Sequence, residues 1–286
     1  MHETIDPVAV VGALSPGARV ISAEPLRGGV SAAVFAVSFA PPDGAPERVV
    51  VRQHRSVAGK DGTPGERAAR EFAALQALHA RGVAVPAPRL FIPPATMVIA
   101  FVDGTSELPP DAAGALAHTL ADIHRLPRKG LPALPTFDDP MPSLHAWFPQ
   151  LHAHPVLQAG CGAFAGDACL VHGDFWPGNV FWQVNQVAAV LDWEDALLGD
   201  PLIDVACMRS ELFRVRDARA ANRFTEAYRQ QLPVDDARLA WWDLFMAAAP
   251  LQYMDGWGLG EGELAARRAA STAWQARALA TLGLDA

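Results

Sequence analysis

The alternation of hydrophobic and polar residues in the first third of the chain predicts a β-rich region. Residues 31–39 are rich in β-branched and aromatic side chains, a Pro-Pro-Asp-Gly turn follows them, and residues 48–53 are a second run of the same kind. This pattern predicts a hairpin preceded by a glycine-containing loop at residues 27–31. A further short apolar strand is predicted at residues 97–102, and the crossing between two lobes is expected there.

One helix is predicted within this region, at residues 64–81. Thr63 and Glu66 have the spacing of a capping box, Pro64 stands at the first helical position, and Gly82 is placed to close the helix. Both ends of the helix are therefore marked by residues that favour a start or a stop.

Glu71 lies on the apolar stripe of this helix, together with Leu75 and Leu78. An inward-facing carboxylate needs a cationic partner, and Arg52 in the preceding strand is the nearest candidate along the chain. The alternative is that Glu71 faces solvent.

The second part of the chain changes to helical spacing. Apolar residues recur at helical intervals within residues 111–126, and from about residue 201 the chain reads as successive helices with breaks near Pro233 and Pro250. The whole pattern predicts an α+β fold of two lobes. Residues 1–102 form the small β-rich lobe with one main helix, and residues 103–286 form the larger, mostly helical lobe.

Composition narrows the class of protein. With 286 residues, 51% hydrophobic and 19% charged, the chain can bury a large core or fill two lobes that share a cleft. A net charge of -8 argues against a nucleic-acid binder, which needs clustered Lys and Arg. No apolar run is long enough for a membrane span and the first residues lack a secretory signal, so a cytoplasmic protein is expected.

Three cysteines, Cys161, Cys169 and Cys207, are an odd number without CxxC spacing. We interpret them as small buried hydrophobes and predict neither a disulfide framework nor a zinc site.

The chemistry is concentrated between residues 169 and 204. His172, Asp174 and Asn179 reproduce the H-x-D-x-x-x-x-N spacing of a phosphoryl-transfer loop, in which the Asp handles the proton of the acceptor hydroxyl and the Asn holds magnesium. His172 allows two interpretations: it shapes the loop by packing and hydrogen bonding, or it titrates in catalysis.

A hairpin is predicted directly after this loop. Residues 180–183 and 188–191 read as short apolar strands, and Asn185-Gln186 suits the two-residue turn between them. In that register Asn179 faces Asp192, which brings two hard oxygen ligands for magnesium together. Asp192 is then the principal ligand, Asn179 the secondary one, and Asp174 the catalytic residue that orients the hydroxyl and takes its proton.

Three segments of the chain resemble a known family. HGDFWPGN, LDWED and GDPLIDVA are similar to the catalytic loop, the metal-binding segment and the following helix of the aminoglycoside phosphotransferase and choline kinase superfamily, which has a protein-kinase-like bilobal fold. The similarity in order and spacing extends from the glycine loop near Arg27 to about Leu212.

The resemblance implies a nucleotide site in the first lobe. A loop would cover the phosphates, an arginine paired to a glutamate would hold the α and β phosphates, and a backbone segment would meet the base. The residues concerned are Gly28, Gly29, Ser31, Arg52, Glu71, Ala100 and Val102. Many kinases have Lys in place of Arg52, and the glycine loop is not a full G-x-G-x-x-G, although the Arg fork suits phosphate oxygens.

Acidic residues around LDWED have further interpretations. Glu194 is either an additional neighbour of the metal or a helix-entry acid. Asp200 has the form of an N-cap before Pro201 and is expected to be structural, as is Asp204.

The acceptor is left open by the sequence. Aromatic and acidic residues of the last helices either form a cage for a protonated amine or pack helices together: Trp241, Trp242, Tyr253, Asp255, Trp257 and Trp274. Amino sugars, amino alcohols, homoserine-like compounds, sugars and macrolides are all compatible.

The expected activity is therefore transfer of the γ-phosphoryl group of ATP or GTP to a hydroxyl of a small molecule, with Mg²⁺, by a monomer or homodimer without nucleic-acid or membrane partners. One alternative is a kinase-like module that binds a nucleotide without turnover. Another is a metal-dependent hydrolase built on His172, Asp174 and Asp192, which lacks an H-x-x-x-H ligand pair.

Overall fold

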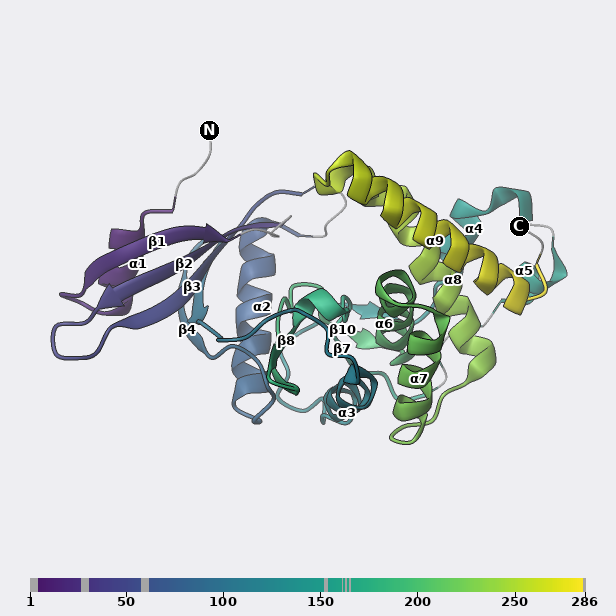
Figure 1. Cartoon of the computed structure of the whole chain (residues 1–286), viewed down its shortest axis with the longest axis horizontal. Coiled ribbons are helices and arrows are strands. Elements are labelled where there is room, and N and C mark those ends of the chain that lie inside the picture. Colours follow the sequence, from purple (N-terminus) through teal and green to yellow (C-terminus); the bar gives the residue numbers. More distant parts are fainter. Residues whose placement is uncertain are drawn as a thin grey trace. The chain divides into compact units, whose positions relative to one another are not determined.

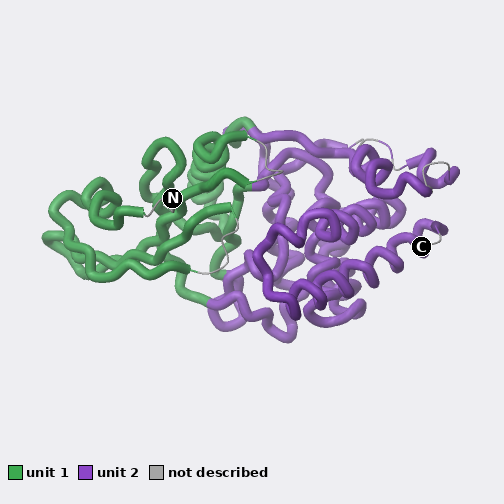
Figure 2. The backbone as a smooth tube through the Cα atoms, turned by 90° about the horizontal axis from the view of Figure 1, so that it is seen from above, with its two compact units in different colours: residues 1–104, 131–133, 188–194 green, residues 105–130, 134–187, 195–286 purple. Residues whose placement is uncertain are grey.

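The computed structural model describes residues 5–26, 31–57, 62–151, 154–160, 162, 164 and 166–284 (Figure 1). The chain divides into two compact units (Figure 2). Unit 1 comprises residues 1–104, 131–133 and 188–194, and unit 2 comprises residues 105–130, 134–187 and 195–286. Unit 1 thus takes up a short late segment of the chain that contains Asp192.

Unit 1 is built on a five-stranded antiparallel sheet in the order β1-β2-β3-β5-β4. Its strands are β1 (Arg19–Leu26), β2 (Ala32–Ala40), β3 (Glu47–His54), β4 (Pro88–Ile92) and β5 (Thr96–Ala100). The predicted hairpin is confirmed as β2 and β3. The third predicted strand ends two residues early, at Ala100.

The core of unit 1 lies between the sheet and its helices. Apolar side chains of β2, β3 and β5 pack with α1 (Pro7–Leu14), and the members buried there include Val11, Val37, Phe39, Val49, Val51 and Val98. The long helix α2 (Pro64–His79) contacts β3, β4 and β5. Burial of β-branched side chains at alternate positions fixes which face of each strand is inward.

Helix α2 begins with the predicted capping box. Glu66 N donates to Thr63 Oγ1 over 3.2 Å, and Thr63 N donates to Glu66 Oε2 over 2.7 Å. The bonds from Thr63 lower the pKa of the Glu66 carboxyl. The helix ends at His79, before the predicted Arg81, and Gly82 follows with a φ of 74° that favours glycine.

Unit 2 is mostly helical. Its longer helices are α3 (Ala112–His124), α6 (Leu202–Val215), α7 (Ala218–Arg229), α8 (Asp236–Tyr253) and α9 (Glu261–Thr281), with shorter α4 (Met141–Trp147) and α5 (Pro155–Ala159). A small sheet has the order β6-β10-β7, formed by β6 (Thr136–Phe137), β10 (Leu197–Gly199) and β7 (Cys169–Val171). None of the helices in the described part of the chain is long and apolar enough to cross a membrane.

One predicted helix break is wrong. The break near Pro233 is present between α7 and α8, but Pro250 lies inside α8, which continues to Tyr253. Pro250 has no backbone N–H and so removes one hydrogen bond of the helix, and only three residues of α8 follow it.

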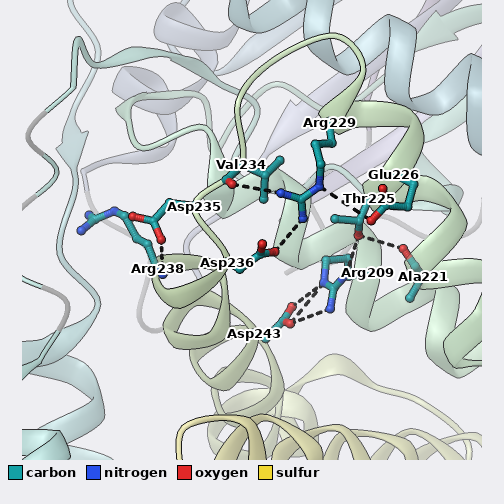
Figure 3. A network of polar contacts seen from close by, with 10 residues as sticks. All are labelled: Arg209, Ala221, Thr225, Glu226, Arg229, Val234, Asp235, Asp236, Arg238 and Asp243. Carbon is teal, nitrogen blue, oxygen red and sulfur yellow. Dashed lines mark hydrogen bonds and ion pairs between the residues drawn. The ribbon is translucent and has the colours of Figure 1, made fainter.

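The helices of unit 2 are joined by a polar network (Figure 3). Arg209 of α6 donates three bonds to the carboxylate of Asp243 of α8, at 2.9 to 3.1 Å, and contacts Thr225 of α7. Burial raises the pKa of Asp243, and Arg209 opposes that shift. A cavity of about 350 Å³ adjoins this network.

Two cysteines can be compared with the prediction. Cys207 is buried and Cys169 is half-buried, and both are free thiols. Burial, followed by Asp204 and Asp200, raises the pKa of Cys169 to about 12. Cys161 lies outside the described residues.

Candidate active site

The predicted catalytic loop, residues 172–179, follows β7 in unit 2 and requires a glycine at its second position. Gly173 has a φ of 82°, and a Cβ there would lie 2.3 Å from the carbonyl oxygen of Asp195. No L side chain fits without moving backbone, so Gly173 fixes the turn that presents Asp174.

A buried carboxylate holds this loop in place. Asp204 of α6 is fully buried and accepts from His172 N at 2.7 Å and from Gly173 N at 2.9 Å. Its Oδ2 also lies 3.1 Å from Nε2 of His124, whose Nδ1 is 2.7 Å from the Tyr228 hydroxyl. The structural role predicted for Asp204 is thus visible, whereas His124 and Tyr228 were missed because α3 and α7 are distant in sequence.

His172 shapes the loop. Its side chain is fully buried, and its Nδ1 accepts from Asp174 N over 3.2 Å. That bond requires the tautomer with the proton on Nε2. The geometry favours the first of the two interpretations given for this residue.

Asp174 and Asn179 lie together at the end of the loop. The Asn179 amide nitrogen donates to both the carbonyl oxygen and Oδ2 of Asp174, each over 2.9 Å. Both bonds use the amide nitrogen, so the amide oxygen takes part in neither of them. Donors of this type, an amide oxygen and carboxylates, fit Mg²⁺.

The predicted hairpin after the loop exists, but its turn was placed wrongly. Strands β8 (Val180–Gln183) and β9 (Gln186–Val190) form a two-stranded sheet, so the turn is Val184-Asn185, one residue earlier than predicted. Val184 adopts a φ of 56°, which is rare for a β-branched residue. The inference that Asn179 faces Asp192 depended on the predicted turn and loses that support.

Unit 1 contains the second group of predicted residues. Arg52 of β3 lies 3.3 Å from Oε1 of Glu71, which confirms the predicted pair, and donates to Oδ1 of Asp192 at 2.7 Å. Arg52 and Glu71 are both buried. Burial alone lowers the pKa of Arg52, but the charges of Asp192 and Glu71 outweigh it, and the net shift is upward.

The LDWED segment is attached to α2 through the same glutamate. Asp192 has a φ of 62°, and the next residue, Trp193, donates its backbone N–H to Glu71 Oε1 over 3.3 Å. The Trp193 indole donates to the carbonyl oxygen of Val190 at 3.0 Å. Glu71 therefore positions both Arg52 and the backbone that carries Asp192.

His54 is a member of this cluster that the sequence analysis missed. Its Nε2 lies 3.0 Å from Glu71 Oε2 and its Nδ1 lies 3.6 Å from Glu194 Oε2, with all three side chains buried. Neither contact has hydrogen-bond geometry. The signal was present: His54 is two residues from Arg52 in β3 and shares its face. Glu194 is followed by strand β10 and not by a helix, so the helix-entry interpretation is wrong, and its further role as a neighbour of the metal stays a prediction.

The structure describes only some of the other residues that were predicted to form the nucleotide site. Gly28 and Gly29 lie outside the described residues. Ser31 is buried, and its carbonyl oxygen accepts from the backbone of Arg55. Ala100 ends β5 and donates its N–H to the carbonyl oxygen of Ala87, the residue before β4, and Val102 follows the strand. Their proposed contacts with a nucleotide stay predictions.

Asp200 is structural as expected, but the N-cap of α6 is Pro201 and not Asp200, so the predicted cap is wrong. Its Oδ1 accepts from Leu202 N at 3.0 Å, while Oδ2 accepts from the Trp242 indole at 2.6 Å and contacts Arg238. The helix itself begins at Leu202, one residue after Pro201. Both oxygens of Asp200 are used structurally.

The aromatic residues of the last helices divide into two groups. Trp241, Trp242 and Trp274 are buried, which favours the packing interpretation for them. Tyr253 is 57% exposed, and Trp257 is half-buried. Within the described ranges, no group of three or more His, Cys, Asp or Glu residues is arranged to hold a metal by itself.

The chain belongs to the phosphotransferase enzyme family, whose profile matches residues 22–242. It is thus a phosphotransferase that uses an alcohol group as acceptor, as the catalytic loop predicts. No match was found among curated protein sequences.

Solved structures confirm the expected fold. A macrolide 2'-phosphotransferase from Brachybacterium faecium is 23% identical, with a TM-score of 0.63 over 94% of this chain and 98% of that one. A choline kinase from Streptococcus pneumoniae is 17% identical, with a TM-score of 0.65 over 96% of both chains. An aminoglycoside-3'-phosphotransferase of type VIII is 19% identical, with a TM-score of 0.59 over 86% of this chain and 98% of that one. The α+β, kinase-like architecture is therefore shared.

Proposed function

We propose that the protein transfers the γ-phosphoryl group of ATP or GTP to a hydroxyl of a small acceptor, such as an aminoglycoside, an amino alcohol or a homoserine-like compound. The observation that carries this proposal is the loop of unit 2. There Asn179 is bonded twice to Asp174, and Asp204 fixes the backbone that precedes them.

Each site residue has a separate task in this proposal. Asp174 orients the acceptor hydroxyl and takes its proton as the new bond to phosphorus forms. Asn179 and Asp192 would hold Mg²⁺, which neutralises charge on the phosphates when bound. The bonds from the Asn179 nitrogen to Asp174 support this, because they use the nitrogen of the amide and not the oxygen that would bind a cation.

The nucleotide is assigned to the first lobe, residues 1–102, and the acceptor and catalytic loop to residues 103–286. Arg52 would hold the phosphates, with Glu71 keeping its guanidinium in place. Solved relatives support nucleotide use: one is a choline kinase in complex with AMP, and another is an ADP-bound aminoglycoside phosphotransferase. A nucleoside triphosphate donor also suits the cytoplasm.

The test is Mg²⁺-dependent release of ADP or GDP across a panel of hydroxyl compounds. Asp174→Ala should keep nucleotide binding and lower acceptor-stimulated turnover by roughly 10²- to 10⁴-fold, the usual loss of a general base. Asp192→Ala should remove metal-dependent nucleotide binding. Asp122→Asn, a change at an exposed acid of the same unit, is the matched control and should be silent.

Two results would contradict the assignment. Near-normal turnover in Asp174→Ala would show that this carboxylate is not the base. Nucleotide binding without stimulation by any acceptor would favour a binding module over an enzyme with this chemistry.

A further inference from the structure

The first ten residues of α9, residues 261–270, are unusually exposed for a helix beside a catalytic loop; we call them the outer half of α9. None of them is buried. The rest of the helix has four buried residues: Ser271, Trp274, Ala278 and Leu279. The ring of Trp274 packs at a tilt against that of Phe213 in α6, with the ring centroids 4.9 Å apart. The helix is therefore anchored by its second half.

Arg267 makes the contact between the outer half and the catalytic loop. Its guanidinium carbon lies 5.7 Å from the ring centroid of Trp176 and 5.9 Å from that of Trp257. Its Nη1 is 3.7 Å from Oε1 of Glu211 in α6, and its Nε is 3.2 Å from Glu263. The side chain is only 15% exposed, so a cation is held between two indoles and two carboxylates.

Trp176 brings this cation close to the chemistry. It lies two residues after Asp174 in the same loop. The ring is close against Gly178, where a Cβ would lie 2.1 Å from it, so the loop fixes the indole. The surroundings are acidic as well: after burial itself, Asp174 and Glu211 are the main causes that raise the pKa of the Cys207 thiol.

Residues 256–262, which we call the glycine segment, reach the second residue of the outer half and contain glycine at every second position: 256, 258, 260 and 262. A Cβ at any of the four would meet nothing within 4 Å. Gly258 has a φ of 68°, but no positive φ is recorded at the other three. Gly260 is the N-cap of α9, a position where glycine is favoured over alanine. Packing and backbone angles give no reason for Gly256 and Gly262, whereas conformational freedom does.

We propose that Arg267 occupies, over Trp176, the place that the cationic group of the acceptor takes, and that the outer half of α9 moves on the glycine segment to exchange one for the other. Arg267 is then the residue that selects acceptors by charge. This inference rests on the proposed kinase function and names a determinant of its acceptor specificity.

The exchange follows from electrostatics. A guanidinium and a protonated amine favour the same indole face and the same carboxylate, Glu211, and two cations cannot share them. When the charge of Arg267 is removed, the indole face and Glu211 become available to bind the cationic group of the acceptor. An anionic acceptor would instead use Arg267 as its partner and would suffer from its loss.

The first arm of the test needs no acceptor. Hydrogen–deuterium exchange of the full chain compares wild type with Arg267→Met, which keeps the apolar stem, and with Arg268→Met. Arg268 is the matched control because it pairs with Asp255 at the exposed surface and does not contact Trp176. We expect exchange at residues 261–270 to rise at least threefold in Arg267→Met only, with residues 274–281 unchanged. Equal exchange in all three proteins would overturn the proposal.

The second arm uses kinetics with kanamycin and choline as cationic probes, glucose as neutral probe and gluconate as anionic probe. Arg267→Met should lower KM for a cationic acceptor by roughly 2- to 25-fold, the range of one cation–π contact. A KM that is unchanged or raised would overturn the role of Arg267, as would exclusive use of glucose or gluconate. If no probe is phosphorylated by wild type, the proposed function fails for these acceptors, and the exchange arm still decides whether Arg267 holds the helix.

A stiffened hinge gives an independent check. Gly262→Ala in α9 meets no steric obstacle, and Gly114→Ala in α3, equally unobstructed, is the control. Local opening should slow by roughly fivefold per helical glycine replaced. Turnover with a cationic acceptor should fall along with it. Slower exchange with unchanged turnover would refute the hinge.

Discussion

The carboxylate of Asp204 offers the sharpest test of how the catalytic loop is held. Asp204→Ala removes the acceptor of two backbone N–H groups, those of His172 and Gly173, and the partner of the His124 ring. Each buried donor left without an acceptor costs about 1–3 kcal/mol. Three such groups give a loss of roughly 3–9 kcal/mol, because Asp204 is fully buried and water has little access.

The magnitude can be measured by thermal unfolding, followed by calorimetry and circular dichroism. For a chain of this size 1 kcal/mol shifts Tm by about 2–4 °C, so Asp204→Ala should lower the transition that contains unit 2 by roughly 6–36 °C. Asp204→Asn keeps one acceptor oxygen and should lose about half as much. Turnover should fall even at temperatures where the variant stays folded, since the loop that carries Asp174 is released.

Asp122→Asn is the control, as it alters an exposed carboxylate of α3 and should change stability by less than about 0.5 kcal/mol. A loss below about 1 kcal/mol in Asp204→Ala would refute the reasoning. So would a large loss of stability with normal turnover, because it would separate Asp204 from the position of the loop.

Three further results follow from single contacts. Arg209→Met removes the partner of Asp243, whose pKa is already raised by burial. A carboxyl group with a raised pKa in the folded state contributes stability that is lost as the pH rises. In urea unfolding, the free energy of unfolding of the variant should therefore differ from that of wild type less near pH 4 than at pH 7. Gly173→Ala should lower stability by a few kcal/mol and abolish turnover, because its Cβ would collide with the Asp195 carbonyl; a normal melting curve would contradict this. Cys169, with a pKa of about 12, has about one thiol in ten thousand ionised at pH 8, so iodoacetamide should label it only after unfolding, as read by peptide mass spectrometry.

Local signals in the sequence predicted the elements that depend on neighbouring residues. The capping box at Thr63 and the β2–β3 hairpin were found because a side chain and a turn of adjacent residues decide them. The Arg52–Glu71 pair was found because an apolar stripe placed a charge inward. In these cases the residues of a short segment were sufficient to predict the structure.

The errors arose where distant contacts override local preference. Asn185-Gln186 is the better turn by composition, yet the turn is Val184-Asn185, with Val184 in a left-handed conformation. Likewise, no spacing rule connects His124 to Asp204, 80 residues further along the chain, because only the packing of α3 near α6 brings them together.

Unit 1 contains segments from separate parts of the chain, and this limits the order in which the protein can fold during synthesis. Residues 188–194 complete it: Asp192 pairs with Arg52, and the N–H of Val190 donates to the carbonyl of Ala84. A ribosome that has released the first 104 residues has therefore made a sheet whose buried Glu71 still lacks its bond from Trp193. Unit 1 must wait for a segment that is made late in synthesis, and a fragment cut after residue 104 would lack that hydrogen bond permanently, although Glu71 would keep its ion pair with Arg52.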